Sequence, residues 1–164
     1  FSKKIRQQYF TGDSHFTCHK KDGTQSNQLG FILIILFELP IMHLLFHFIL
    51  SPFAANLTTG LTLLGLAFFL AEYKAISIRP VSITPNSLII RYGVLNPLEI
   101  SLANIESIQL SSGFIRRSSN VKRFNLAGNP NVEIQLNSGK FIYLGVDSPS
   151  DFILTLEKYR LKLL

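Results

Sequence analysis

Hydrophobic residues are distributed unevenly along the chain, and their densest concentration lies between Leu29 and Tyr73. Two apolar runs of 22 residues each, Leu29–Leu50 and Pro52–Tyr73, are separated only at Ser51-Pro52, and neither contains Lys or Arg. About 20 consecutive apolar residues cross the hydrocarbon core of a bilayer as an α-helix. The pattern therefore predicts a two-helix transmembrane hairpin over residues 29–73.

Basic residues flank both outer ends of this hairpin. Lys20 and Lys21 precede it, Lys74 and Arg79 follow it, and the Ser51-Pro52 connector carries no charge. Loops rich in Lys and Arg remain on the cytoplasmic side of a membrane. We therefore expect a two-pass integral protein of the inner or plasma membrane, with both termini cytoplasmic. A signal peptide is disfavoured because its apolar region spans only about 7–15 residues.

The first run contains three ionisable residues, Glu38, His43 and His47. Such groups cost about 2.5–3.5 kcal/mol each inside a bilayer, so they raise a functional hypothesis. His43 and His47 are four residues apart and share a helix face, a spacing suited to a metal, a haem or a proton relay. Glu38 lies on another face of a straight helix, although Pro40 could kink it. The alternative is that neutral histidines and a protonated Glu38 face the second helix or another copy of the chain.

From Lys74 onward the period changes, and apolar residues alternate with polar ones in short stretches separated by turn residues. This pattern predicts β-strands. The expected strands lie within Ala75–Ile83, Ser87–Tyr92, Leu98–Leu102, Ile105–Leu110, Asn131–Leu136 and Lys140–Gly145. Thr84–Ser87 and Asn137–Gly139 are expected to be turns. Strands at this spacing favour an antiparallel meander or barrel over βαβ units.

The last residues predict a helix over residues 149–163. Ser148 is a good N-cap, Pro149 suits the first helical position, and Asp151 completes a capping box. One apolar face is expected from Phe152, Leu156, Tyr159 and Leu163. An amphipathic helix after a curved sheet is expected to cover its open end, so residues 74–164 form one α+β domain of about 90 residues.

The segment before the hairpin, residues 1–28, is polar and basic, with apolar residues too sparse to build a core. It is expected to be largely disordered. The net charge of +6 divides into +3 before the hairpin, −2 within it and +5 after it. Basic flanks around apolar spans indicate contact with anionic lipid head groups rather than with nucleic acid. Cys18 is the only cysteine, which excludes an intrachain disulfide.

Basic residues gather in the least regular stretch of the domain, Ser111–Arg123. Its candidate lipid- or partner-binding residues are Phe114, Arg116, Arg117, Lys122 and Arg123. The chain has no Gly-rich phosphate loop, no zinc-type spacing of Cys and His, and no G-x-S-x-G motif. The sequence therefore predicts a protein without enzymatic activity and without a cofactor.

Several segments together resemble the bacterial pleckstrin-homology-like (PH-like) membrane proteins. They are the two spans, Ser82–Thr84 with Ser87–Gly93, Ile100–Ile108, Asn131–Leu144 and Asp147–Phe152, and the resemblance covers about residues 30–164. It implies a bent antiparallel sheet of about seven strands capped by the C-terminal helix, and no common enzymatic activity. In phosphoinositide-binding relatives, basic residues cluster around the first strand–strand loop. The corresponding loop here, Thr84–Ser87, carries none.

Two classes of function follow. The first is a membrane-anchored scaffold or interaction module, in contact with the bilayer and with a membrane protein partner or a second copy of the chain. The second is an intramembrane metal, haem or proton site that uses Glu38, His43 and His47. Metal analysis and an absorption spectrum of the purified protein distinguish the two classes.

Overall fold

The structure is a computed structural model, and it describes residues 10–18, 20, 23–92, 96–116, 118–125 and 129–163. The chain divides into two compact units. One contains Ser26–Lys74, and the other combines the residues before this segment with those after it. The hairpin is therefore an insertion between two parts of the same domain, and each unit is described below by itself.

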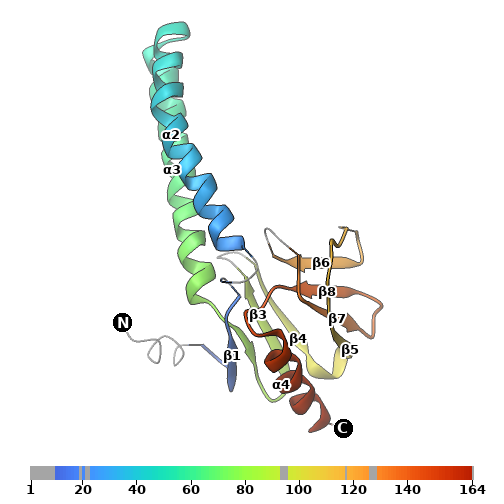
Figure 1. The fold of residues 1–164 in the computed structure, drawn as a ribbon. Helices are drawn as coiled ribbons and strands as arrows, with labels where there is room; N and C mark the ends of the chain where they lie inside the picture. The colour runs from blue at the N-terminus through green and yellow to red at the C-terminus, as the bar shows by residue number, and fades with distance from the viewer. Residues whose placement is uncertain are drawn as a thin grey trace. The chain divides into compact units, whose positions relative to one another are not determined.

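The hairpin consists of helices α2 (Thr24–Ile49) and α3 (Pro52–Ile78), which run side by side (Figure 1). Its two-helix form confirms the prediction, but the helices extend beyond residues 29–73 at both ends. Pro52 opens α3 as expected, and the Ser51 side chain accepts a hydrogen bond from the Ala54 N–H at 3.1 Å. Residues Ala75–Ile78, predicted to start a strand, instead continue α3. Pro80 disfavours helical geometry at the residue before it, so the helix ends there.

Few side chains of the hairpin are buried between its helices. Ile32 packs on the α2 side, and Ala55 and Leu66 are buried on the α3 side. Most other large apolar side chains are exposed, among them Phe37 and Phe48 at 74% and 81%. A soluble protein rarely exposes so much contiguous apolar surface. Both helices are long and apolar enough, by length and composition, to cross a membrane.

The first sheet of the domain, sheet A, has the strand order β1-β2-β3-β4 and is antiparallel throughout. Its strands are β1 (Ser14–Phe16), β2 (Val81–Ile83), β3 (Ser87–Tyr92) and β4 (Asn96–Ser101). The predicted turn between β2 and β3 is confirmed. There Thr84 Oγ1 accepts a hydrogen bond from the Ser87 N–H at 2.8 Å, and the Thr84 N–H donates to the Ser87 carbonyl at 2.8 Å.

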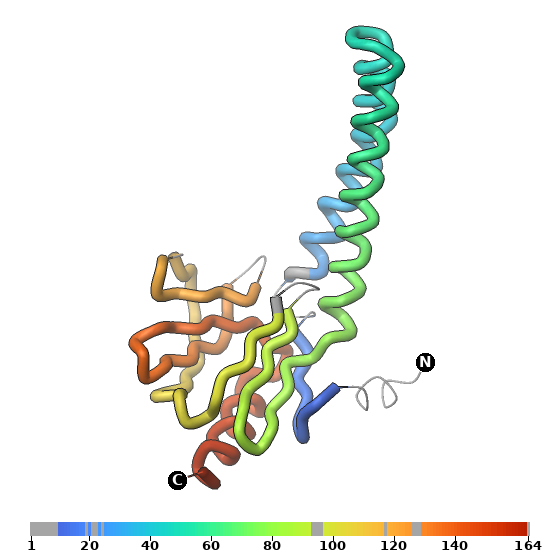
Figure 2. Tube along the Cα trace, turned by 180° about the vertical axis from the view of Figure 1, so that it is seen from behind, coloured from blue at the N-terminus to red at the C-terminus, as the bar shows by residue number. Residues whose placement is uncertain are grey.

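Strand β1 corrects the prediction of a disordered tail over residues 1–28. It pairs with β2, with Ser14 opposite Ile83 and Phe16 opposite Val81. Figure 2 shows β1 beside β2, although the whole hairpin separates them in the sequence. Cys18 is buried in the domain core, and Phe16 packs against the same core. Residues 1–9, 19, 21 and 22 of the predicted tail lie outside the described residues.

The approach to β1 requires glycine at position 12. Gly12 has a φ of +140°, a conformation that side chains with a Cβ rarely adopt. A Cβ there would lie 2.7 Å from the Ser82 Cβ. The close approach lets the Asp13 N–H donate a hydrogen bond to the Ile83 carbonyl at 2.8 Å. Gly12 therefore allows the N-terminal segment to lie directly on sheet A.

The second sheet, sheet B, has the order β5-β7-β8-β6. A short 3₁₀ helix, η1 (Leu102–Asn104), leads into its strands β5 (Ile105–Leu110), β6 (Val121–Phe124), β7 (Val132–Leu136) and β8 (Phe141–Leu144). Strand β6 was missed in the basic stretch, and it pairs with β8 in parallel. The sheet is therefore mixed, not purely antiparallel. The turn at Gly139, with a φ of +73°, is confirmed between the antiparallel strands β7 and β8.

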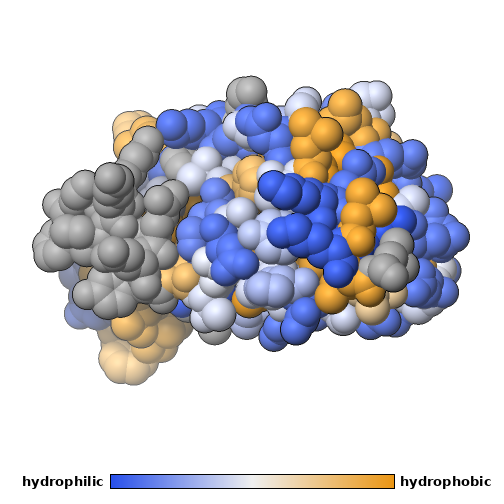
Figure 3. Space-filling view, turned by 90° about the horizontal axis from the view of Figure 1, so that it is seen from below, coloured by the Kyte–Doolittle hydropathy of each residue, from blue (hydrophilic) through white to orange (hydrophobic). Residues whose placement is uncertain are grey.

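Helix α4 (Pro149–Leu161) completes the domain core. Phe152 and Leu156 are fully buried among side chains of both sheets, which confirms the predicted packing face. The helix ends two residues before the expected boundary, and Leu163 remains exposed. The capping box is wrong, because the Ser148 side chain makes no cap hydrogen bond. Instead, the Ser148 carbonyl accepts a hydrogen bond from the Phe152 N–H at 3.0 Å. With most of its hydrophobic residues turned inward, the domain presents the largely hydrophilic face seen in Figure 3.

Candidate functional site

A groove of about 580 Å³ lies between β4 of sheet A and the β6–β8 side of sheet B. Its apolar lining residues are Leu98, Ile100, Leu136, Phe141 and Ile142, and its polar ones are Glu99, Ser101, Asn104, Ser119, Asn120, Lys122, Asn137, Ser138 and Lys140. Ile100 and Ile142 belong to the buried core, so the floor of the groove is apolar. Its volume lies in the range of ligand-binding pockets.

One wall of the groove is the open edge of a sheet. Among the described residues, β4 is the last strand of sheet A and has a hydrogen-bonded neighbour, β3, on one side only. A strand in this position leaves backbone N–H and C=O groups free for another strand, although Pro97 has no N–H to donate. The edge is six residues long, and Leu98–Ser101 line the groove along most of it.

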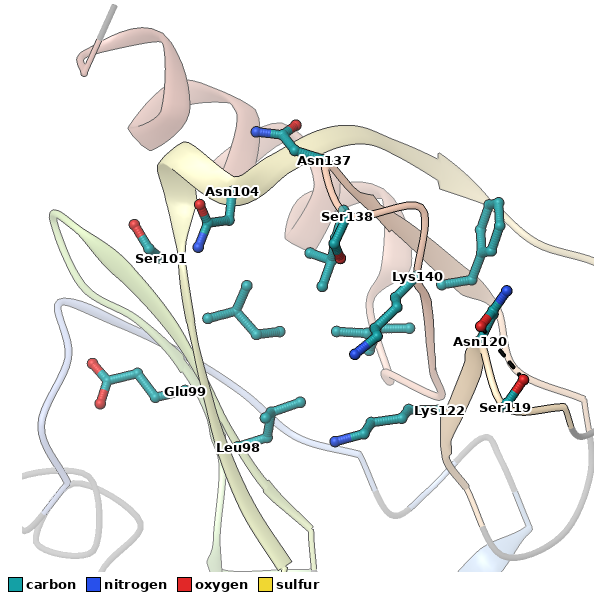
Figure 4. Close-up of a pocket in the computed structure, with 14 residues that line it drawn as sticks. Leu98, Glu99, Ser101, Asn104, Ser119, Asn120, Lys122, Asn137, Ser138 and Lys140 are labelled. Atoms are coloured by element: carbon teal, nitrogen blue, oxygen red, sulfur yellow. Dashed lines mark hydrogen bonds between the residues drawn. The ribbon is translucent and has the colours of Figure 1, made fainter.

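The opposite wall is basic. Lys122 on β6 and Lys140, just before β8, extend into the groove from two different strands, and their amino groups point toward the β4 wall (Figure 4). Both side chains are exposed, and within the described part of the chain neither forms an ion pair. The Glu99 carboxylate on the β4 wall accepts a hydrogen bond from Ser87 Oγ at 2.7 Å and points away from the two lysines. The groove therefore combines an apolar floor with two cations on one side.

The structure separates the basic residues that the sequence placed in one cluster. Lys122 and Arg123 are neighbours on β6, so their side chains leave opposite faces of the strand. Arg123 turns away from the groove and donates a 2.7 Å hydrogen bond to the Ile115 carbonyl, while its guanidinium lies 5.6 Å from the centre of the Phe114 ring. Arg123 therefore braces the 111–116 loop.

The exposed members of the predicted cluster lie on that loop. Phe114 is 79% exposed and Arg116 is also exposed, whereas Arg117 lies outside the described residues. Of the five predicted residues, only Lys122 lines the groove. Lys140 was missed as a candidate because it is an isolated basic residue in the sequence, and only the pairing of β6 with β8 brings it near Lys122.

The ionisable residues of α2 are only partly brought together. Glu38 and His43 line a cavity of about 250 Å³ in the hairpin with Thr58, Thr59 and Thr62 of α3. His43 Nδ1 lies 2.7 Å from Thr59 Oγ1, a hydrogen-bond distance. His47 stacks on His43 with ring centroids 6.2 Å apart, but it does not line the cavity.

Among the described residues, no group of three or more His, Cys, Asp or Glu side chains is arranged to hold a metal ion. The structure thus does not gather Glu38, His43 and His47 into a metal site. The hydrogen bond between His43 and Thr59 of α3 instead agrees, for His43, with the alternative in which these side chains face the second helix.

A third polar cluster secures β1 to the sheet. Ser82 Oγ accepts a hydrogen bond from Arg91 Nη1 at 2.6 Å and lies 2.8 Å from His15 Nδ1. Arg91 Nη2 also donates to the Thr11 carbonyl at 3.1 Å. Burial lowers the pKa of His15, and the nearby Arg91 charge lowers it further, so the neutral imidazole is favoured. This cluster is structural, because its polar atoms bind one another across β1, β2 and β3.

The comparison with protein families covers most of the chain. A family model described as "Bacterial PH domain" matches residues 30–160, which include most of α2, all of α3, the strands that follow and nearly all of α4. No curated protein and no solved structure matches the chain. Strand β1 and Cys18 precede the matched residues. The two helices, the bent pair of sheets, the C-terminal helix and this match together show that the chain belongs to the bacterial PH domain family.

Proposed function

We propose that this protein is a membrane-anchored, non-enzymatic interaction module whose PH-like domain works at the cytoplasmic surface of the membrane. The observation that carries the proposal is the pairing of β1 with β2 on either side of an exposed apolar hairpin. Because the two flanks of the hairpin belong to one sheet, both ends of the inserted segment must leave the membrane on the same side. The domain is then tethered to the bilayer by two connections.

The cytoplasmic orientation follows from the basic residues that flank the hairpin. Lys20 precedes α2, and Lys74 and Arg79 lie in and after the last turns of α3, while the connector at Ser51 is uncharged. Positive residues are retained on the cytoplasmic side. The connector is therefore placed on the outer side of the membrane.

Cysteine labelling tests this topology in intact cells. In a Cys18→Ser background, Ser51→Cys is expected to react with a membrane-impermeant maleimide added outside. Ser138→Cys, at an exposed turn of the domain, is expected to react only after the membrane is permeabilised. Reaction of Ser138→Cys from outside would contradict the proposed orientation. Extraction of the protein by alkaline carbonate would contradict the anchor itself.

Contact with anionic lipid is the second part of the proposal. The 111–116 loop presents an exposed phenyl ring at Phe114 and an exposed Arg116, and Arg117 follows in the sequence. Aromatic and basic side chains together suit the interface between head groups and acyl chains. A basic residue near an anionic surface contributes about 1 kcal/mol. Its effect reaches about 8 Å at physiological salt.

Vesicle binding measures this contribution. The full chain in zwitterionic nanodiscs is expected to bind vesicles that contain anionic lipid, and to release them as salt is added. The double variant Arg116→Ser, Arg117→Ser is expected to weaken binding by about 2 kcal/mol, or roughly thirtyfold. The matched control is Lys158→Ser, Lys162→Ser, which removes two exposed charges at and just after the end of α4. Equal losses of vesicle binding in the two double variants would show a general charge effect and would contradict a specific role of the 111–116 loop.

A further inference from the structure

The groove between β4 and the β6–β8 side has three features that a single ligand must match. They are an apolar floor, a free strand edge along one wall, and two lysines on the other wall. We propose that the groove binds an extended segment of a partner protein, which adds as a strand to β4 and places acidic side chains toward Lys122 and Lys140. The proposal rests on the interaction-module function and names the partner's chemistry.

The free edge of β4 is the feature that selects a polypeptide. Backbone N–H and C=O groups along an open edge are satisfied by another strand, and this mode of recognition gives affinity through main-chain hydrogen bonds. Strand β4 spans six residues, roughly 20 Å at about 3.3 Å each, and each of them except Pro97 has a backbone N–H. A phosphate-bearing head group makes no use of such a row of alternating donors and acceptors, so the edge favours a peptide over a lipid.

The floor selects the side chains of that peptide. In an added strand, successive side chains point to opposite faces, so alternate residues face the floor. Leu98, Ile100, Leu136 and Ile142 make this floor apolar, and Ile100 and Ile142 are nearly fully buried. Small branched apolar residues at every second position match it. The apolar side chains of a partner strand would shield this floor from water.

Charge selects the residues that alternate with the apolar ones in the partner segment. Lys122 and Lys140 converge on the groove from β6 and from the start of β8, and no acidic residue within the described part of the chain pairs with either. Glu99 on the β4 wall is engaged with Ser87 and points away. The two cations are therefore available to carboxylates of an incoming strand. A basic segment would be repelled at the same positions.

The probe is a fluorescein-labelled heptapeptide amide, Gly-Glu-Val-Glu-Val-Glu-Gly, and the protein is the full chain in zwitterionic nanodiscs. Fluorescence anisotropy is expected to show saturable binding that weakens as salt is added. Lys122→Glu with Lys140→Glu is expected to weaken binding at least tenfold. The matched control, Lys158→Glu with Lys162→Glu at the end of α4, reverses the same number of charges and is expected to leave binding unchanged. Both groove lysines are exposed, so the double variant keeps the fold, and hydrogen exchange of the domain checks this.

Two altered peptides separate strand addition from simple charge attraction. The peptide with Lys in place of each Glu keeps the apolar pattern, and it is expected not to bind. Methylation of the Val amide nitrogens and methylation of the second and third Glu amide nitrogens block opposite edges of the added strand. One of these two peptides is expected to lose binding and the other to keep most of it. Loss of binding in both, or in neither, would overturn strand addition.

The remaining outcomes also decide the question. Binding that ignores the two lysine substitutions would place the peptide elsewhere. Absence of peptide binding up to millimolar concentration, together with vesicle binding that depends on Lys122 and Lys140, would make the groove a head-group site instead. Because the nanodiscs are zwitterionic, failure of the proposed lipid contact leaves the peptide result unaffected. The membrane anchor is tested separately by carbonate extraction.

Discussion

Replacing Phe152 by alanine is expected to lower the free energy of unfolding of the PH-like domain by about 3–5 kcal/mol, the range seen for buried aromatic residues. Phe152 is fully buried on α4 and packs into the core shared by the two sheets. Its removal leaves a cavity bounded by both sheets and by Phe16, which the surrounding backbone can fill only in part. For a domain of this size the loss is a large share of its total stability.

Native-state hydrogen exchange of the full chain is the measurement, since the slowest amides of β3 and β8 report global unfolding of the domain. The matched control is Leu154→Ala on the same helix, where the side chain is 67% exposed. Its expected effect is within about 0.5 kcal/mol. If the slowest amides were as well protected from exchange in Phe152→Ala as in Leu154→Ala, α4 would not be part of the core.

The second large effect is expected at Phe16, in the segment that the sequence assigned to a disordered tail. Phe16→Ala is expected to lower the stability of the domain by about 2–3 kcal/mol, less than for a fully buried Phe because the ring is only partly buried. The ring meets Phe152 edge to face, with centroids 5.1 Å apart and planes at 89°. A disordered tail would contribute nothing to the free energy of unfolding.

A double-mutant cycle between Phe16 and Phe152 tests the contact itself. Edge-to-face aromatic pairs contribute about 0.5–1.5 kcal/mol beyond the area they bury, so the two losses are expected to be non-additive by that amount. Phe114→Ala is the control, because this ring is 79% exposed and lies on another part of the domain. Additive losses for Phe16 and Phe152 would show that β1 does not rest on α4.

Strand β1 has a consequence for experiments on the isolated domain. A fragment that starts at residue 74 lacks β1 and therefore lacks Phe16 and Cys18, both of which pack in the domain core. It also exposes the edge of β2 that β1 covers. A soluble form should instead join residues 10–23 to residue 75 through a flexible linker in place of the hairpin.

The sequence alone was enough for the elements whose signal is local. The two apolar runs predicted the hairpin because a long helix satisfies its backbone hydrogen bonds within its own residues. The β3 strand and the β7–β8 turn were readable because alternation and turn chemistry act over a few residues. The same holds for α4, whose face of Phe152 and Leu156 follows from helical spacing.

Tertiary structure decided the features that depend on residues distant in the sequence. Strand β1 has only three residues, Ser14–Phe16, and is held by partners that lie beyond the hairpin. Strand β6 is four residues long, and its two adjacent charged residues interrupt the alternation of apolar and polar positions. Only its parallel pairing with β8 stabilises it as a strand. In both cases the favourable terms are non-local hydrogen bonds and burial.

The candidate site was predicted from the sequence only in part. Composition identified Lys122 as a basic residue of interest, but it grouped Lys122 with Arg123, whose side chain leaves the opposite face of β6. The groove lies between β4, the edge strand of sheet A, and the β6–β8 side of sheet B. The free edge of β4 and the convergence of the two lysines depend on which strands pair with each other. Those pairings join residues that are distant in the sequence, so no local pattern predicts them.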